Sequence, residues 1–152
     1  MNVGDTLPPL EIPVTRTLIV AGAIASRDYQ DVHHDAALAQ EKGSPDVFMN
    51  ILTTNGLVGR YITDHLGPRA VLRKVAIRLG APNYPGDTMT LTGTVTAVSG
   101  AAVSGTTVSG TTVSGTTVSG TTVSGTTIEI RVVGANGIGH HVTGTVTAEV
   151  PA

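Results

Sequence analysis

Asp28 and His33 are separated by four residues and combine two side-chain types that are well suited to moving protons. An imidazole changes its charge near neutral pH, and a carboxylate beside it can hold one tautomer and one ring orientation. Such a pair can exchange protons with a substrate or with a water molecule. The spacing alone is a weak signal, so the interpretation depends on the elements that would hold these residues.

The neighbouring ionisable residues have simpler interpretations. We expect Asp35 to cap the N-terminus of a helix. His34 is predicted to point away from the pair, and Asp31 is interpreted as a loop acid, with a contact to the pair as the alternative. We predict no metal at His33-His34-Asp35 or His140-His141, because adjacent side chains seldom converge on one ion and the sequence has no His-Glu-x-x-His spacing.

Two helices are predicted after this segment. Asp35 precedes a short helix at Ala36–Lys42. Ser44-Pro45-Asp46 carries the start signals of a long helix, which Gly67-Pro68 ends. The apolar residues at helical spacing that predict its buried face are Phe48, Ile51, Leu52, Val58, Ile62 and Leu66. The apolar segment Thr17–Ser26 fits either a helix or a strand, because its period is unclear.

After the long helix, apolar and polar residues alternate with a period of two, which indicates antiparallel strands with one buried face and one wet face. The segments with this alternation are Val71–Leu79, Met89–Ala97, Ile128–Val132 and Val142–Val150. Asn136-Gly137 predicts a tight hairpin before the last strand. One long helix that faces a mostly antiparallel sheet predicts the α+β class.

Residues 103–127 are five copies of Val-Ser-Gly-Thr-Thr, and Val98–Ala102 is a near-copy. Side chains alternate faces along a strand, so a five-residue step sends successive valines to opposite faces and builds no continuous apolar stripe. We therefore interpret residues 98–127 as an insertion, an extended hairpin or loop between two strands of a single domain spanning 1–152. A β-solenoid or adhesive ribbon is the alternative.

Composition excludes several classes of protein. A chain of 152 residues is the size of one domain. Its formal net charge of -2, without any run of Lys or Arg, argues against nucleic-acid binding. The absence of cysteine excludes disulfides and cysteine nucleophiles. No apolar run approaches the roughly 20 residues that span a bilayer, and Met1–Leu10 has no signal-peptide pattern, so we expect a cytoplasmic protein without a membrane partner.

The segment Ala25–Asp35 resembles the hydratase motif of the MaoC-like, (R)-specific enoyl-CoA hydratases, in which a small residue, an Asp, four residues and a His follow one another. Val3-Gly4-Asp5, the Pro45-initiated helix and Tyr84–Thr88 extend this resemblance along the chain. Within the family, Arg27–Asp35 and Asn50–Thr53 are similar to the small subunits of bacterial steroid side-chain enoyl-CoA hydratases.

The resemblance implies a hot-dog fold, in which an antiparallel sheet wraps around a long central helix. It implies reversible addition of water to a trans-2-enoyl-CoA, with Asp28 and His33 acting on one water molecule and with no metal or redox cofactor. A backbone N–H at Met49 or Asn50, near the start of the long helix, is expected to bind the thioester oxygen. The expected partner is a second hot-dog subunit or a second copy of the chain, with an acyl-CoA tunnel between the two domains.

The chain departs from the family pattern at three places. Arg27 replaces the usual Gly before the Asp, Gln30-Asp31 replaces Asn-Pro, and Phe48-Met49 replaces His-Gly at the start of the long helix. The subgroup resemblance implies a steroid side-chain thioester as substrate. The alternatives are a homodimeric hydratase for fatty enoyl-CoA, a noncatalytic acyl-CoA-binding subunit and a hot-dog thioesterase.

Overall fold

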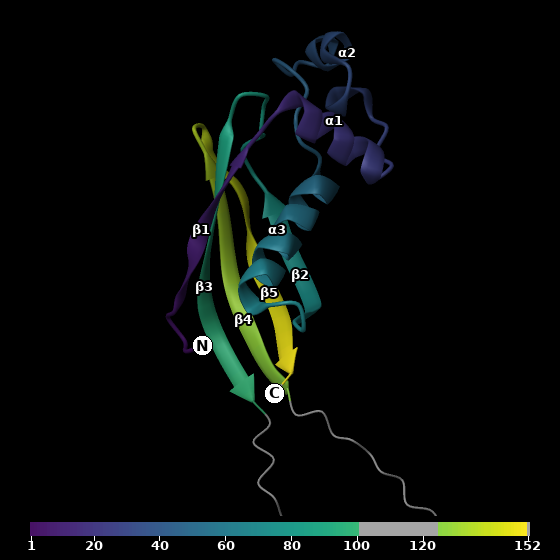
Figure 1. Cartoon of the computed structure of the whole chain (residues 1–152). Helices are drawn as coiled ribbons and strands as arrows, with labels where there is room; N and C mark the ends of the chain where they lie inside the picture. The colour runs from purple at the N-terminus through teal and green to yellow at the C-terminus, as the bar shows by residue number, and fades with distance from the viewer. Residues whose placement is uncertain (101–124, 152) are drawn as a thin grey trace, which may run out of the picture.

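The computed structural model describes residues 1–100 and 125–151. Within these residues, five strands form one antiparallel sheet in the order β1-β3-β4-β5-β2 (Figure 1). The strands are β1 (Thr6–Pro13), β2 (Val71–Leu79), β3 (Thr88–Gly100), β4 (Gly125–Asn136) and β5 (Gly139–Pro151). The helices are α1 (Arg16–Ala25), the 3-10 helix η1 (Asp31–His33), α2 (Ala36–Glu41) and α3 (Ile51–Leu66).

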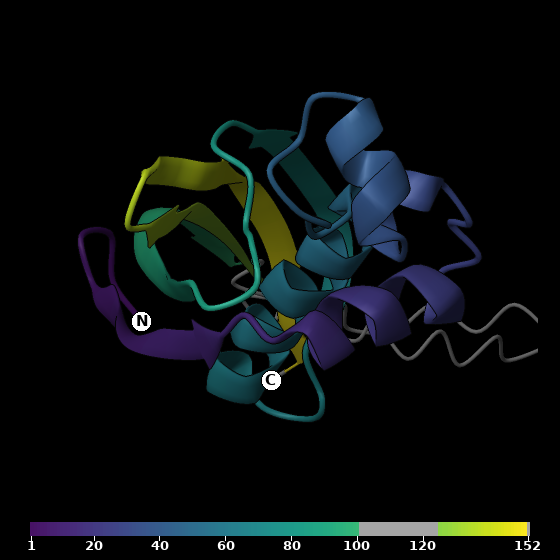
Figure 2. The same ribbon diagram turned by 90° about the horizontal axis from the view of Figure 1, so that it is seen from above.

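The sheet curves around α3, and the core fills the space between them (Figure 2). The helix contributes Val58, Tyr61 and Ile62 to this core. The buried sheet residues that face it include Met89, Leu91, Val95, Ile130, Val132 and Val146. The Tyr61 hydroxyl also donates a hydrogen bond of 3.1 Å to the carbonyl oxygen of Pro8, which ties the helix to the edge strand β1. The predicted α+β architecture, a sheet wrapped around one long helix, is confirmed.

The long helix begins at Ile51, so the predicted start near Pro45 is wrong. The backbone N–H of Phe48 donates to Val32, and that of Met49 donates to Asn83. These bonds to distant segments hold the chain outside the helix, and Asn50 becomes its N-cap. Ile51 and Leu52 consequently lie in the first turn with 47% and 48% exposure, and not in the buried face predicted for them.

The ambiguous segment after β1 is the helix α1, which Thr15 caps by accepting a hydrogen bond from the backbone N–H of Leu18. This helix crosses α3 closely, because a Cβ placed on Gly22 would overlap the side chain of Thr53. The contact brings the C-terminal end of α1 to the N-terminal end of α3. The predicted cap of α2 is also confirmed, since Asp35 accepts from two backbone N–H groups of that helix.

The predicted alternation holds along β5 and along β3 as far as Val95, but it shifts at a bulge in β2 and at another in β3. In β2 the register shifts between Leu72 and Lys74, so Leu72 packs against the core while Val71 is exposed. In β3 the shift lies between Val95 and Ala97, and it leaves Ala97 exposed. Bulges of this kind insert one residue and reverse the faces of the residues beyond them.

Residues 101–124, which include the first four copies of the pentapeptide and the start of the fifth, lie outside the described residues. Their flanks are described, and Gly100 of β3 pairs with Thr126 of β4. The two flanking strands therefore end side by side at one end of the sheet, opposite to the end that carries α1 and α2 (Figure 1). At that other end, the predicted hairpin joins β4 to β5, and Asn136 stabilises its turn by accepting from the N–H groups of Ile138 and Gly139.

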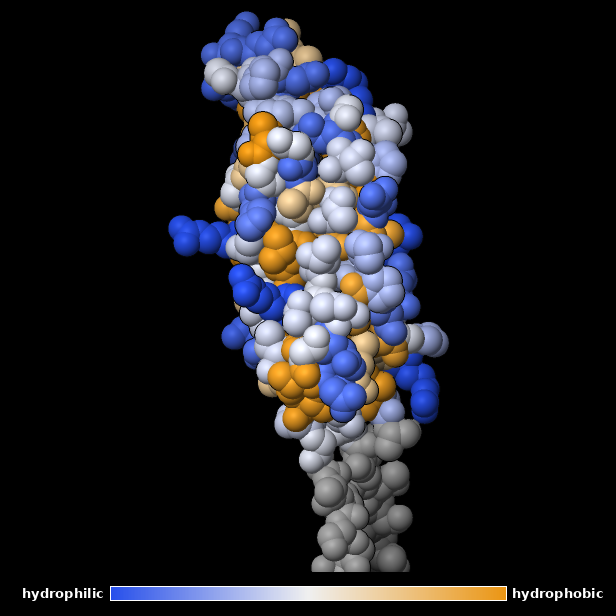
Figure 3. Space-filling view, turned by 90° about the vertical axis from the view of Figure 1, so that its left-hand side faces the viewer, coloured by the Kyte–Doolittle hydropathy of each residue, from blue (hydrophilic) through white to orange (hydrophobic). Residues whose placement is uncertain are grey.

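The face seen from the β1 side carries apolar residues in separate small groups among neutral and polar ones (Figure 3). This distribution fits the alternating pattern of the strands, in which threonines point outward. Among the described residues, no helix combines the length and the apolar character that crossing a membrane requires.

Candidate active site

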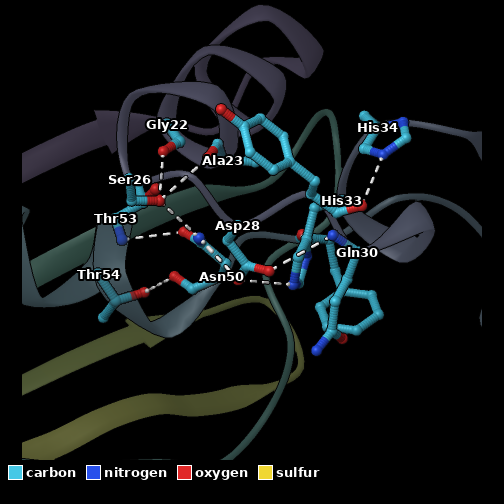
Figure 4. Close-up of polar contacts among 12 residues, drawn as sticks. Gly22, Ala23, Ser26, Asp28, Gln30, His33, His34, Asn50, Thr53 and Thr54 are labelled. Atoms are coloured by element: carbon cyan, nitrogen blue, oxygen red, sulfur yellow. Dashed lines mark hydrogen bonds and ion pairs between the residues drawn. The ribbon is translucent and has the colours of Figure 1, made fainter.

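Asp28 and His33 meet at the end of the sheet where α1, η1 and α3 come together (Figure 4). Asp28 follows α1, and its backbone N–H donates to the carbonyl oxygen of Ala23. The Oδ2 atom of Asp28 lies 3.4 Å from the Nε2 atom of His33. The two side chains are 20% and 8% exposed, respectively, so they are largely shielded but still reachable from one side.

The second ring nitrogen of His33 fixes the tautomer of the imidazole. Nδ1 lies 2.7 Å from the carbonyl oxygen of Phe48. Because a carbonyl oxygen only accepts, Nδ1 must carry the proton, and Nε2 of the neutral ring presents a lone pair toward Asp28. Two acceptors do not bond to each other directly, but one water molecule bound beside them can contact both. The arrangement therefore suits a water held by Asp28 and deprotonated by His33.

Asn50, which is 2% exposed, links this pair to the start of α3. Its amide Nδ2 donates to Asp28 Oδ2 at 3.0 Å and to Ser26 Oγ at 2.9 Å (Figure 4). Its Oδ1 accepts from the backbone N–H of Thr53, which is the N-cap bond of the helix. Sequence reasoning missed this side-chain role. The preference of Asn for the N-cap was the available signal, but the helix was expected to begin six residues earlier, at Pro45.

The backbone donor predicted at Met49 does not fit the structure. The N–H of Met49 already donates to the carbonyl oxygen of Asn83 at 3.1 Å, and the residue is buried. A group committed to a buried hydrogen bond cannot also bind a substrate oxygen without losing that bond. Of the two predicted backbone donors, Asn50 remains the candidate.

Arg27 explains one departure from the family pattern. Its φ angle is +57°, in the left-handed region, and within the described residues it is the only residue other than glycine with a positive φ. The chain needs this conformation to end α1 and turn Asp28 back toward Ala23. Glycine adopts it without a steric penalty, whereas a residue with a Cβ loses about 1 kcal/mol. The usual glycine before the acid therefore has a conformational reason.

The remaining ionisable neighbours lie outside the pair. His34 directs Nε2 toward the carbonyl oxygen of Tyr29, at 3.2 Å. Asp31 forms an ion pair of 2.8 Å with Lys42, and the hydrogen bond and positive charge of Lys42 lower the pKa of Asp31. Within residues 1–100 and 125–151, no three His, Asp or Glu side chains are grouped closely enough to hold a metal ion.

Large apolar side chains are exposed in the segments that carry Asp28 and Asn50. Ile24 and Tyr29 flank Asp28 along the chain, and Ile51 and Leu52 follow Asn50. All four are exposed. Large apolar side chains that stay exposed in segments with polar functional groups are typical of a surface that binds an apolar ligand or another protein.

Comparisons with known proteins agree with this architecture. The family model described as a MaoC like domain matches residues 2–120. The chain is 42% identical over 144 residues to the 3-oxo-4,17-pregnadiene-20-carboxyl-CoA hydratase beta subunit of Mycobacterium tuberculosis, covering 95% of this chain and 92% of that protein.

Solved structures give the same result. A chain of the ChsH1–ChsH2 complex from Mycobacterium tuberculosis matches with a TM-score of 0.78 and 41% identity over 98% of each chain. The (R)-hydratase from A. caviae, at 17% identity, matches with a TM-score of 0.75 over 99% of this chain and 98% of the other, and shows the shared fold. These matches confirm the predicted hot-dog fold and the predicted resemblance. The chain belongs to the MaoC-like domain family.

Proposed function

We propose that this chain is a hydratase subunit that adds water to a trans-2-enoyl-CoA, with Asp28 and His33 as the catalytic residues. The observation that carries the proposal is the 3.4 Å approach of Asp28 Oδ2 to a His33 Nε2 that presents its lone pair. Membership of the MaoC-like family, and the relative named as a hydratase beta subunit, support the reaction class.

In the proposed reaction, one water molecule binds beside Asp28 and His33 and contacts both side chains. His33 Nε2 takes one proton from this water while its oxygen forms a bond to the β-carbon of the enoyl thioester. The π electrons move toward the thioester carbonyl, and a proton from the pair is delivered to the α-carbon. The net change is addition of H and OH across the double bond. No electrons leave the substrate, so the proposed reaction needs no redox cofactor, and we propose that it proceeds without a metal.

Negative charge develops on the thioester oxygen during this addition, and donors aimed at that oxygen lower the barrier. The backbone N–H of Asn50, just before the first turn of α3, is the donor we propose. It would act from the same residue whose side chain contacts Asp28.

The proposed substrate is an enoyl-CoA with a bulky steroid side chain. The relative that is named for a pregnadiene-carboxyl-CoA shares 42% identity over nearly the whole chain. The exposed apolar residues Ile24, Tyr29, Ile51 and Leu52 suit a large apolar acyl group. A fatty enoyl-CoA is the alternative substrate, and its hydration by a homodimer is the alternative assembly.

The proposed partner is a second, different chain with its own hot-dog domain. The 42%-identical relative is named as a beta subunit, and the structural match at 41% identity belongs to a complex of two named proteins. Such a partner would cover part of the apolar surface beside the Asp28–His33 pair and complete the acyl pocket. The cytoplasmic location inferred from the sequence remains a prediction.

The test is an assay of the chain alone and with its co-expressed partner, using crotonyl-CoA and a steroid enoyl-CoA and following the loss of enoyl absorbance. We expect Asp28→Asn and His33→Gln each to lower kcat by about 10²-fold or more, because each removes a proton-transfer group. The circular dichroism spectrum and partner binding should stay as in the wild type. Unchanged hydration in both variants would overturn the proposal, and release of free CoA without hydration would identify a thioesterase.

A further inference from the structure

The side chain of Asn50 bonds to three elements at once. Its Oδ1 caps α3 through the N–H of Thr53, at 2.9 Å. Its Nδ2 reaches Ser26, which ends α1, at 2.9 Å, and Asp28, in the loop that follows, at 3.0 Å. The Asn side chain carries an acceptor oxygen and a nitrogen with two N–H donors on the same carbon atom, which is what these three bonds require.

The Asp28 oxygen that accepts the hydrogen bond of the Asn50 amide is also the one that faces the imidazole of His33. Oδ2 lies 3.0 Å from Asn50 Nδ2 and 3.4 Å from His33 Nε2. The other carboxylate oxygen has only a long contact of 3.5 Å with the N–H of Gln30. The amide is therefore the strongest restraint on the rotation of this carboxylate, and it directs Oδ2 toward His33.

The backbone of Asn50 is also held by hydrogen bonds within α3, and these connect to the sheet. Its carbonyl oxygen accepts from the backbone N–H of Thr54 at 3.2 Å. The hydroxyl of Thr54 lies 2.8 Å from Nε2 of the buried His141 on β5. Nδ1 of His141 is in turn 2.7 Å from the carbonyl oxygen of Ala81. The support of Asn50 thus extends from the first turn of α3 into the sheet, and buried bonds of this kind fix one side-chain position.

We propose that Asn50 is a positioning residue, which couples formation of the first turn of α3 to the orientation of Asp28 toward His33. The proposal rests on the hydratase function proposed above. Two elements contact the Asp28 carboxylate: η1 presents the titratable His33, and α3 presents the uncharged Asn50. The uncharged Ser26 at the end of α1 contacts the same Asn50 amide. The amide therefore orients the acid without adding a charge.

Two substitutions distinguish the capping role of the Asn50 side chain from its role as a donor to Asp28, because Ser and Asp cap helices about as well as Asn. Asn50→Ser keeps a neutral cap but has no donor that reaches Asp28. We expect it to lower kcat by about tenfold to a hundredfold with KM nearly unchanged, as loss of an oriented proton-transfer group does. Asn50→Asp keeps the cap and places two carboxylates together. The acidic limb of its kcat/KM profile should move to higher pH by about one unit or more, because such pairs bind a shared proton.

Thr15→Ala is the matched control for lost capping. Thr15 caps α1 at the end of that helix away from Asp28, so its loss should cost stability of about the same size and leave kcat as in the wild type. All variants are assayed in the complex with the partner subunit.

Wild-type kcat in Asn50→Ser, together with an unshifted profile in Asn50→Asp, would overturn the positioning role. Should Asn50→Asp fail to fold, kcat of Asn50→Ser decides alone. If Asp28→Asn also retains full activity in the same assay, the hydratase mechanism fails. If Asp28→Asn is inactive and Asn50→Ser is normal, only the inference about Asn50 fails.

Discussion

The orientation of a single ring decides what the site can do. The carbonyl oxygen of Phe48 holds the proton of His33 on Nδ1, and this leaves Nε2 free to accept a proton beside Asp28. The 3.4 Å between Nε2 and the carboxylate oxygen leaves no room for a water molecule on the line between them, but one water bound beside the two atoms can contact both. At this scale the structure supports water activation as the chemistry of the pair.

Arg27 supplies a prediction about backbone strain. Arg27→Gly should raise the free energy of unfolding by about 0.5–1 kcal/mol, because the left-handed conformation that costs Arg about 1 kcal/mol costs Gly little, although Gly loses more entropy on folding. Arg27→Ala is the control, since it removes the guanidinium but keeps the Cβ. Urea denaturation of the three proteins measures the difference. Equal stability of the Gly and Ala variants would show that the backbone conformation is not the cause.

His141 supplies a prediction about pH. Burial lowers its pKa from the ordinary value of 6.5. The unfolded chain therefore takes up a proton below 6.5 more readily than the folded chain, so this contribution to stability is complete above pH 6.5 and is lost as the pH falls toward the lowered pKa. The slope from this one group reaches at most about 1.4 kcal/mol per pH unit.

Urea midpoints at pH 7.5 and 5.5 test the His141 prediction, with the higher midpoint expected at pH 7.5. His141→Gln should flatten this dependence. The pKa values of Asp31 and Asp46 are lowered from 3.8, so those residues act in a more acidic window and do not obscure the comparison. An equally steep dependence in the Gln variant would assign the effect to another group.

The helices α1 and α3 cross closely beside the site. Gly22 of α1 lies against Thr53 of α3, and the two helix ends beyond this contact carry Ser26 and Asn50. The spacing of the two helices therefore sets the distance over which the Asn50 amide reaches Asp28. A change in this spacing acts on the site without touching either catalytic residue.

Gly22→Ala should lower the free energy of unfolding by about 1–3 kcal/mol, because the added methyl group overlaps Thr53 and forces the helices apart. Gly56→Ala is the matched control in α3. A Cβ there meets no atom within 4 Å, so the better helix propensity of Ala should stabilise that variant by about 1 kcal/mol. Adding Thr53→Ala should recover part of the Gly22→Ala loss in thermal or urea denaturation. Full independence of the two substitutions would contradict the contact.

The Asp28–His33 pair and the described flanks of the repeat lie at opposite ends of the sheet. The Asp28–His33 pair lies at the end of the sheet with α1 and α2, together with exposed apolar residues that a partner or an acyl group would cover. Gly100 and Thr126, which are described residues on the two sides of the segment 101–124, are paired neighbours at the other end of the sheet.

Deleting residues 103–122 removes four copies of the pentapeptide and leaves a short connection between paired strands. We expect hydration by the complex to stay within about threefold of the wild type, because surface connections tolerate changes in length when their ends are adjacent. Activity with the partner and the thermal midpoint are the measurements. A shortened chain that folds, binds its partner and yet loses turnover would give the repeat a role in the reaction.

Sequence by itself determined what depends on near neighbours. The Asp35 cap, the Asn136 turn and the alternation from Met89 to Val95 each follow from contacts within a few residues or from the two faces of a strand. The identity of the Asp28–His33 pair came from a motif of comparable length. Hydrophobic periodicity and helix capping depend on residues that are close in the sequence, so predictions based on them hold in the folded protein.

Tertiary structure decided what depends on distant partners. The backbone N–H groups of Phe48 and Met49 donate to the carbonyl oxygens of Val32 and Asn83. These bonds override the local start signals, and the helix begins at Ile51 with Asn50 as its N-cap. That shift puts the Asn50 amide against Asp28, 22 residues away in the chain. Which of several good local signals prevails is set by hydrogen bonds between remote segments, and those exist only once the chain has folded.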